Sequence, residues 1–297
     1  MFYGLQYIEP VFRPPSEARS LILQVTNGCS WNNCTFCDMY TQPQKKFKAK
    51  AEDEVLQDIL QASRSVIPFE KVFLADGDAM VLPTRRLKLI LEQIRQHMPW
   101  VKRVSAYCLP RNVRKKTVEE LRELQALGLG IVYVGCETGD DQLLTIVQKG
   151  ETFESNKDAL LKLKAAGIQS SVMVLNGLGG KVYSEQHAAN TARLMNETQP
   201  EFLSTLVVSF PLGEERFATG FEGLWQPLDQ MTLFLELRYF LSQLELNNTV
   251  YRSDHASNYL PLKGTLGADK SRLLAQLDQV IHQPGSVRLR EEWQRGL

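Results

Sequence analysis

The sequence predicts an α/β fold in which six strand–helix units follow one another and a helical extension ends the chain. Short apolar runs alternate with segments of helical periodicity from residue 20 to about residue 215. Of the 297 residues, 43% are hydrophobic, which is enough for a large buried core. After Pro211 the alternation changes to a glycine-rich stretch followed by helical segments. This order favours parallel strands joined by right-handed crossovers.

The six expected strands are short, apolar and bounded by turn residues. Each is four to eight residues long in its apolar part, as buried parallel strands usually are. We expect them at residues 21–26, 71–75, 102–107, 131–136, 170–176 and 202–209.

The helical segments between these strands carry apolar side chains on one face. In the first, Val55, Ile59 and Leu60 recur at helical spacing and can cover a sheet. The helix that begins at Thr117 opens with a capping box, in which Glu120 is the partner, and ends at Gly128. The other helices are expected at residues 53–66, 84–97, 140–148, 153–166, 185–197, 230–245 and 268–282.

This organisation predicts a core over residues 1–215 and an extension over residues 216–297 that packs on the core and caps it. No flexible linker separates the two parts, so the extension is not expected to be an independent domain. Periodicity alone leaves two arrangements of the core open, a doubly wound open sheet and a barrel that lacks its last quarter.

Charge and hydropathy restrict the partners and the location. Thirty-four basic and 34 acidic residues cancel, so the whole protein has no electrostatic attraction to nucleic acid or to an anionic membrane. No run of about 18 apolar residues is present, and the N-terminus lacks the pattern of a secretory signal. We expect a cytoplasmic protein without membrane partners, and binding of nucleic acid is disfavoured.

Three of the five cysteines crowd into nine residues. Cys29, Cys34 and Cys37 follow a buried strand, where α/β folds place ligand sites, and their spacing indicates metal ligands and not disulfides. Three thiolates are one short of a closed zinc site, and no histidine lies nearby. A [4Fe–4S] cluster held by three cysteines keeps one iron open, as catalysis requires.

Two other functions compete with this interpretation. The spacing C-x4-C-x2-C also begins the plant-type ferredoxin pattern, which needs a fourth cysteine, and the next one here is Cys108. The rivals are therefore a ferredoxin-like electron carrier and a zinc-stabilised binding module.

Over residues 20–210 the sequence resembles the radical S-adenosylmethionine (radical SAM) superfamily. That family usually has C-x3-C-x2-C with an aromatic residue before the last cysteine, and Phe36 is that residue here. This chain has one more residue between Cys29 and Cys34. The resemblance implies that Cys29, Cys34 and Cys37 ligate a [4Fe–4S] cluster and that S-adenosylmethionine is the second cofactor.

Three further segments resemble the family's cofactor-binding segments in the same order. Residues 73–79 resemble the segment that holds the methionine amino group, with Asp78 in place of a glutamate. Residues 132–140 resemble the ribose-binding segment, and residues 172–180 the segment that packs on adenine. The resemblance thus implies cofactor contacts for Phe36, Asp76, Gly77, Asp78, Glu137, Thr138 and Val174.

Fold and reaction follow as expectations from the same resemblance. It implies a partial (β/α)6 TIM-like barrel, with the site at the mouth formed by the carboxyl ends of the strands. It also implies reductive cleavage of S-adenosylmethionine to a 5′-deoxyadenosyl radical, which takes hydrogen from a small-molecule or peptide substrate. An external one-electron donor of the flavodoxin or ferredoxin type would be needed, and the enzyme would be an oxidoreductase or a transferase.

The C-terminal extension supplies the candidates for the substrate side. Residues 252–259 combine polar, aromatic and titratable side chains, and we expect His255 and Tyr259 to be catalytic and Asn258 to bind substrate. The alternative is an ordinary loop that ends at Pro261.

Two further expectations concern the remaining cysteines and a run of lysines. Cys108 and Cys136 are expected to be buried small hydrophobes, and the lysines at 45, 46, 48 and 50 to lie in a solvated loop.

Overall fold

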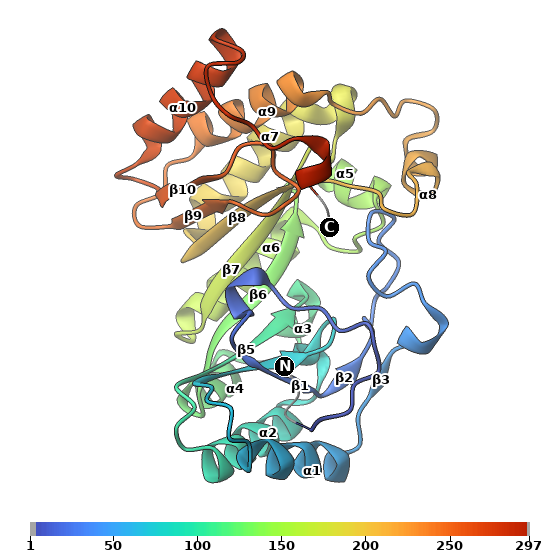
Figure 1. Ribbon diagram of the computed structural model, residues 1–297, viewed down its shortest axis with the longest axis vertical. Helices are drawn as coiled ribbons and strands as arrows, with labels where there is room; N and C mark the ends of the chain where they lie inside the picture. The colour runs from blue at the N-terminus through green and yellow to red at the C-terminus, as the bar shows by residue number, and fades with distance from the viewer. Residues whose placement is uncertain (1–3, 296–297) are drawn as a thin grey trace. The chain divides into compact units, whose positions relative to one another are not determined.

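The computed structural model describes residues 4–295, which form two compact units that interleave along the chain (Figure 1). The first unit comprises the described residues up to Asn32, together with Met39–Val134 and Leu161–Ser170. The second comprises Asn33–Asp38, Gly135–Leu160 and the described residues from Ser171 onward. The strands of the main sheet follow the order β1-β4-β5-β6 in the first unit and β7-β8-β9-β10 in the second.

Parallel strands form the centre of the first unit. They are β1 (Leu21–Gln24), β4 (Lys71–Ala75), β5 (Arg103–Cys108) and β6 (Leu129–Glu137), which passes into the second unit at its end. Leu23, Leu74, Ala106 and Val132 occupy one row across the four strands, and all four are fully buried. A row of apolar side chains fixes the register, because a shift by one residue would turn every side chain to the other face.

Amphipathic helices cover these strands (Figure 1). Val55 and Ile59 of α1 (Glu52–Ser63) and Leu87 and Leu91 of α2 (Thr84–His97) are buried on their inner faces. The predicted capping box of α4 (Val118–Ala126) is confirmed, since Glu120 N donates to Thr117 Oγ1 at 3.1 Å. Three short elements were not predicted: α3 (Pro110–Arg114) and the paired strands β2 (Thr26–Asn27) and β3 (Lys48–Ala49).

The second unit continues the alternation of strands and helices. Strands β7 (Gln169–Asn176), β8 (Phe202–Val207) and β9 (Val250–Ser253) are parallel, and β10 (Leu262–Thr265) is antiparallel to β9. Helices α7 (Gly180–Thr198), α9 (Gln230–Gln243) and α10 (Lys270–His282) pack as a layer beside them (Figure 1). The other helices are α5 (Asp141–Ile146), α6 (Phe153–Ala165), whose residues are divided between the two units, and α8 (Glu215–Ala218). The remaining short turns are 3-10 helices at Pro15–Glu17, Pro43–Lys45, Ala79–Val81, Thr219–Phe221 and Glu292–Gln294.

The six predicted strands and the predicted helices are confirmed as elements, with ends shifted by a few residues. The extension contains its two predicted helices and also two strands that were not predicted. Strand β9 pairs with β8 in parallel after the intervening helix α9, so the strand–helix alternation extends one unit further than expected. The division at residues 215 and 216 stays a prediction, because the compact units interleave.

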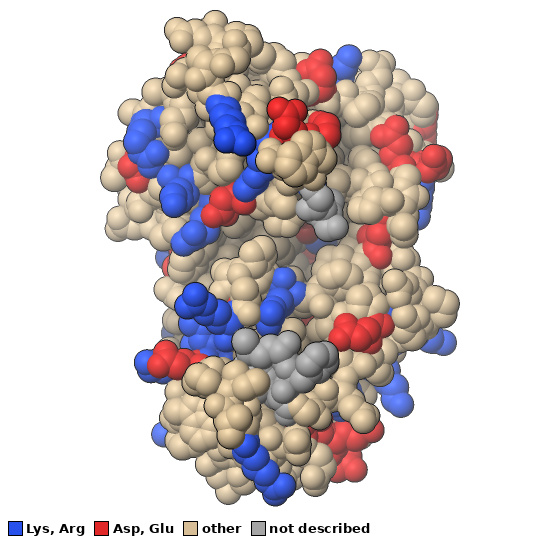
Figure 2. Space-filling view, viewed as in Figure 1, with Lys and Arg blue, Asp and Glu red and all other residues tan. Residues whose placement is uncertain are grey.

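Basic and acidic side chains are interspersed on the face shown in Figure 2, without one large area of a single sign. In the described part of the chain, no helix has the length and apolar character needed to cross a membrane.

Lys45 does not lie in a solvated loop, which corrects the expectation for the lysine run. Its side chain is fully buried, and its ammonium group forms a short ion pair with the fully buried carboxylate of Asp76. Lys45 also donates to Ile8 O at 2.9 Å. Lys46 beside it is exposed. A sequence pattern of alternating lysines cannot show that one of them turns inward to meet a strand end.

Replacing Lys45 by methionine should lower the free energy of unfolding by about 3–5 kcal/mol, because it leaves Asp76 as an uncompensated buried charge. Urea unfolding of the metal-free protein measures this change. Lys46→Met is the matched control and should change the stability little. Equal stability of the two variants would show that the buried pair is not needed.

Candidate active site

In the first unit, the ends of β1 and β4 meet at Cys29. A Cβ atom added to Gly77 would lie 2.9 Å from Cys29 Cβ, from Gly28 O and from the ring of Tyr40. Atoms at such distances would overlap, so only glycine permits this approach of the two strand ends. The structure therefore brings the predicted segment around Gly77 against the first cysteine.

The two acidic residues beside Gly77 are held inside the protein. Asp78 accepts a hydrogen bond from Ser30 N at 3.1 Å and a short one from Ser30 Oγ. Burial raises the pKa of Asp78, against the opposing effect of the Ser30 bonds. Asp76 is bound by Lys45 and accepts from Tyr40 Oη at 2.9 Å. Both side chains thus support the loop around Cys29, and their contact with the cofactor stays a prediction.

Trp31, the residue that follows Ser30, is held by the side chain of Arg111. The guanidinium of Arg111, on α3, lies 3.8 Å from the ring centroid of Trp31. Asn112, next to it, is within 3.5 Å of Asp78. The unpredicted helix α3 therefore supports the residues directly after the first cysteine.

The other two cysteines lie in the second unit, in segment 33–38. Thr35 N donates to Val147 O at 3.0 Å, and Cys37 N donates to Cys34 O at 3.2 Å. Phe36 packs against a buried apolar group that includes Leu143 and Val147 of the α5 region. The aromatic residue before the last cysteine is therefore an anchor of this segment in the structure.

Lys149 is a site residue that the sequence reasoning did not single out. Its side chain is 5% exposed, donates to Glu137 Oε1 at 2.9 Å and lies 5.6 Å from the ring centroid of Phe36. Burial alone would lower the pKa of Lys149, but the charges of Glu137 and Cys34 outweigh it and hold the pKa above its ordinary value. A buried cation thus lies near Cys34, one of the three expected metal ligands.

Glu137 reaches Lys149 because of its backbone conformation. It ends β6 with a φ of 65°, in the left-handed region that non-glycine residues rarely adopt. A Cβ atom at Gly135 would collide with the Glu137 carboxylate, so the glycine is required for the side chain to fold back. Such a conformation is typical of residues whose position serves a site.

Thr138, the other expected ribose contact, has its hydroxyl occupied within the protein. It is fully buried, its Oγ1 lies 2.8 Å from His187 Nδ1, and it accepts from Asp140 N at 3.0 Å. These contacts fix the turn that follows Glu137. A direct contact of Thr138 with ribose stays a prediction.

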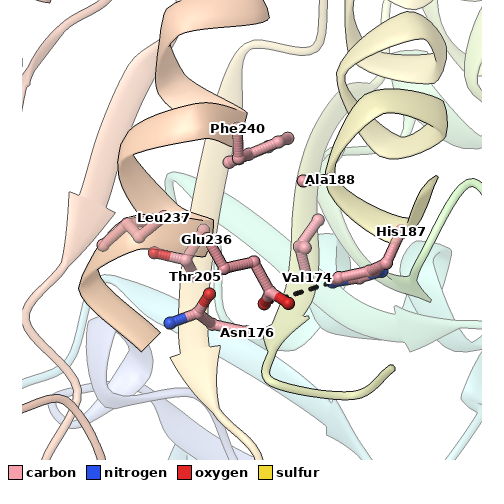
Figure 3. Close-up of a pocket in the computed structure, with 8 residues that line it drawn as sticks. All are labelled: Val174, Asn176, His187, Ala188, Thr205, Glu236, Leu237 and Phe240. Atoms are coloured by element: carbon pink, nitrogen blue, oxygen red, sulfur yellow. Dashed lines mark ion pairs between the residues drawn. The ribbon is translucent and has the colours of Figure 1, made fainter. Parts of the chain in front are cut away.

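A buried histidine and glutamate connect this turn to the end of β7 (Figure 3). Glu236, on α9, points toward His187 on α7, with 3.9 Å between Oε1 and Nε2. Glu236 also accepts from Gly177 N at 2.6 Å and from Ser184 Oγ at 2.5 Å. No local sequence pattern indicates this network, because its members lie on α7, on α9 and in the turns after β6 and β7.

Val174 and Asn176 of β7 line the small cavity beside this network (Figure 3). The cavity has a volume of about 10 Å³. That is room for about one water molecule and excludes a substrate. We conclude that the network positions the end of β7 and does not itself bind a substrate.

The three substrate-side candidates make mainly structural contacts. Asn258 is 4% exposed, accepts from Val207 N at 3.0 Å and donates to Thr205 O at 2.8 Å, so its amide extends the hydrogen bonding of β8. Tyr259 donates to Glu292 at 2.6 Å. His255 lies 3.0 Å from Ser257 Oγ, and burial and then Arg290 lower its pKa. Their roles toward a substrate stay predictions.

The fit of an iron–sulfur cluster rests on the chemistry of the donors. Among residues 4–295, no three His, Cys, Asp or Glu side chains form a group that could hold a metal ion, so ligation by the three cysteines stays a prediction. Two observations fit it. Lys149 provides positive charge near Cys34, and Thr35 Oγ1 is buried without a hydrogen-bond partner in the described structure. A spare hydroxyl beside a ligand can donate to cluster sulfur.

Comparison with known proteins gives one consistent result. Residues 23–195, more than half of the chain, match the profile of the radical SAM superfamily. A curated relative, 4′-phospho-dehydrooxetanocin synthase of Priestia megaterium, is 26% identical over 164 residues, which are 50% of this chain and 22% of that protein. The chain therefore spans about a fifth of that relative.

Solved structures show the same fold at low identity. Coproporphyrinogen III oxidase (HemN) from Escherichia coli, a radical SAM enzyme, aligns with a TM-score of 0.57 and 18% identity over 76% of this chain and 54% of its own. The methyltransferase TsrM from Kitasatospora setae, solved with cobalamin and a [4Fe–4S] cluster, aligns with a TM-score of 0.51 and 18% identity over 63% of this chain and 36% of its own. The expected fold class, a partial TIM-like barrel, is thereby confirmed.

The buried Glu236 and His187 should have opposite effects on the pH dependence of stability. Burial raises the pKa of Glu236 from 4.5 to about 7, so the stability it contributes is present at low pH and is lost as the pH rises toward 7. Burial lowers the pKa of His187 from 6.5 to about 4, with Asp140 opposing, so its contribution is lost as the pH falls from 6.5 toward 4.

Replacing Glu236 by glutamine removes only the first effect. The free energy of unfolding of Glu236→Gln should therefore rise, relative to that of the unchanged protein, as the pH increases from 4.5 to 7. Urea unfolding at several pH values across this range measures the difference. Exposed Glu245→Gln is the control and should run parallel to the unchanged protein. A parallel course for Glu236→Gln as well would contradict the assignment.

Proposed function

Because the chain belongs to the radical SAM superfamily, we propose that it binds a [4Fe–4S] cluster through Cys29, Cys34 and Cys37 and cleaves S-adenosylmethionine reductively. The observation that carries the proposal is the three-cysteine segment at the end of β1, which lies within the part of the chain that matches the family. Family members use these two cofactors, and the relative TsrM was solved with its cluster bound.

When bound and reduced, the cluster supplies one electron that breaks a carbon–sulfur bond of S-adenosylmethionine, giving methionine and a 5′-deoxyadenosyl radical that takes a hydrogen atom from the substrate. The protein's own task is to position these groups and exclude competing hydrogen donors. The remaining assignments concern how the chain does so.

In the first unit, the residues around Gly77 position Cys29 and receive the methionine moiety. Gly77 lets the backbone lie against Cys29. Asp78 accepts a hydrogen bond from Ser30, the residue after Cys29. Because the carboxylates of Asp76 and Asp78 are engaged by protein groups, their backbone is the part that remains for the amino group of the cofactor.

In the second unit, Glu137 and Lys149 form the polar part of the cofactor site. We assign Glu137 to the ribose hydroxyls, while Lys149 orients its carboxylate and adds positive charge near Cys34. Thr138 shares the ribose assignment, and its observed contacts also place the Glu137 turn. Val174, at the end of β7, would pack on adenine.

We assign the substrate to the class of small molecules or peptides. His255 and Tyr259 are the candidate catalytic residues and Asn258 is a candidate substrate ligand, near the carboxyl ends of β8 and β9. An external one-electron donor of the flavodoxin or ferredoxin type would reduce the cluster. A reducing cytoplasm suits a protein in which none of the five cysteines, all within the described residues, forms a disulfide.

Replacing Cys34 by alanine should abolish both assembly of the cluster under anaerobic conditions and release of 5′-deoxyadenosine, because two thiolates cannot hold the cluster. Visible absorbance, bound iron and product analysis measure these effects. Cys108→Ala is the matched control, since Cys108 is a buried thiol outside the segment, and it should retain the cluster.

The unchanged protein tests the rival functions in the same experiment. A [4Fe–4S] spectrum that S-adenosylmethionine perturbs supports the proposal. A [2Fe–2S] spectrum would indicate an electron carrier, and a colourless zinc protein would indicate a binding module. Cluster binding and full cleavage activity in Cys34→Ala would also refute the ligand assignment.

Replacing Glu137 by glutamine should weaken binding of S-adenosylmethionine by about tenfold, because a charge-assisted hydrogen bond to ribose, worth about 1.5–3 kcal/mol, becomes a neutral one worth about 0.5–1.5 kcal/mol. The iron content should stay unchanged, since Glu137 is not a ligand. Equilibrium binding to the loaded protein measures the dissociation constant. Exposed Glu154→Gln should bind normally, and unaltered affinity in Glu137→Gln would remove the ribose assignment.

A further inference from the structure

Arg216 of α8 binds the backbone of both cysteines in segment 33–38. One guanidinium nitrogen, Nη2, donates to Cys37 O at 2.7 Å and lies 3.3 Å from Cys34 O. The same nitrogen is 3.1 Å from the carboxylate of Asp38. All these residues belong to the second unit. The two expected metal ligands are thus connected through one side chain from far along the sequence.

An arginine suits this task better than other side chains. The segment contains no regular helix or strand, so its carbonyl groups need donors from elsewhere. The guanidinium is planar, always charged and carries several N–H donors in a fixed arrangement. All three contacts use Nη2, whose two N–H groups lie in the guanidinium plane, so the two carbonyl oxygens and the carboxylate are held at one point. A lysine ammonium would place the charge on a flexible stem and lose more conformational freedom on binding the same groups.

The helix that carries Arg216 is rigidly anchored. Phe217 and Phe221 are 0% and 2% exposed, and their rings pack with those of Phe210 and Trp225 at centroid distances between 4.7 and 6.0 Å. We call these four residues the aromatic patch. Phe36, between Cys34 and Cys37, packs against the same apolar group. Arg216 and the cysteine segment therefore share one hydrophobic support.

The end of α5 provides a second common support. A Cβ atom at Gly220, just after α8, would lie 2.6 Å from Ile146 O, so the turn after α8 closely approaches this helix end. The next carbonyl, Val147 O, accepts the hydrogen bond from Thr35 N at 3.0 Å. Ile146 and Val147, at the end of α5, thus lie against the turn after α8 and against the cysteine segment, respectively.

We propose that Arg216 is a positioning residue that fixes Cys34 and Cys37 in the geometry required for the cluster. Helix α8 and the aromatic patch hold Arg216 in place. The assignment to cluster binding rests on the proposed function. The restraint itself does not, because all the contacts lie within the polypeptide. Its effects on the metal-free protein and on the loaded protein can therefore be measured separately.

The first experiment measures the reaction of each cysteine with iodoacetamide in the reduced, metal-free protein, followed by mass spectrometry. In Arg216→Ala, Cys34 and Cys37 should react about three- to tenfold faster, because charge-assisted hydrogen bonds that limit opening of the segment are lost. Cys29 serves as the internal control, since Arg216 makes no described contact with it. Arg216→Lys should give intermediate rates, because it retains the charge but lacks the planar guanidinium.

Arg272→Ala is the matched external control. Its side chain is 50% exposed, compared with 46% for Arg216, and it binds a carboxylate and a carbonyl on α10 and β10, away from the cysteines. It should leave all the reaction rates unchanged. Unchanged rates in Arg216→Ala as well, or an equal acceleration of Cys29, would overturn the proposal.

The second experiment measures loss of iron to a chelator from the reconstituted protein. Arg216→Ala should lose iron severalfold faster than the unchanged protein and Arg272→Ala. Equal rates of loss would overturn the part of the proposal that concerns the cluster. If the unchanged protein takes up no cluster while the cysteine reactivities follow the expected pattern, the proposed function fails and the restraint by Arg216 stands.

Discussion

The structure around the cysteines depends on one constraint, which is that a segment without regular secondary structure must be held in place by hydrogen bonds from elsewhere. Gly77 allows the end of β4 to lie against Cys29, and Asp78 binds the backbone of Ser30. In the second unit, Val147 O accepts from Thr35 N, and Arg216 binds two carbonyl groups. The ends of neighbouring elements thus supply what the cysteine segment cannot supply itself.

Two of the carboxylates beside these supports are in buried ion pairs. The carboxylate of Asp76 is compensated by Lys45, and that of Glu137 by Lys149. The hydrogen bonds to Asp78 come from Ser30 and Asn112, which are both neutral. This is consistent with the raised pKa of Asp78. Buried ion pairs add little net stability compared with apolar packing, because desolvation offsets their attraction. Their concentration at the strand ends therefore indicates positioning of a site and not a need for stability.

The sequence predicted what depends on local pattern and missed what depends on tertiary placement. The six strands and the capping box at Thr117 follow from periodicity and short-range chemistry, so they were found. Strand β9 was missed because it has four residues and alternates between buried and exposed positions at the end of a helical region. The contacts of Asn258 with the backbone of β8 were not predicted, and neither was the contact of Arg216 with Cys37, which is 179 residues away. No local pattern encodes such contacts.

Residues of the expected extension bind the backbone of segments that come earlier in the chain. Three residues of the extension each contact a different segment of the second unit. These segments were predicted to bind the cofactors or to form a neighbouring strand. Arg216 binds the cysteine segment, Glu236 binds the backbone of Gly177 after β7, and Asn258 binds β8. Because each contact goes to backbone, it fixes the course of the chain whatever side chains the segment presents. The extension can thus determine how firmly the cofactor residues are positioned, while the residues of the core determine which groups they offer.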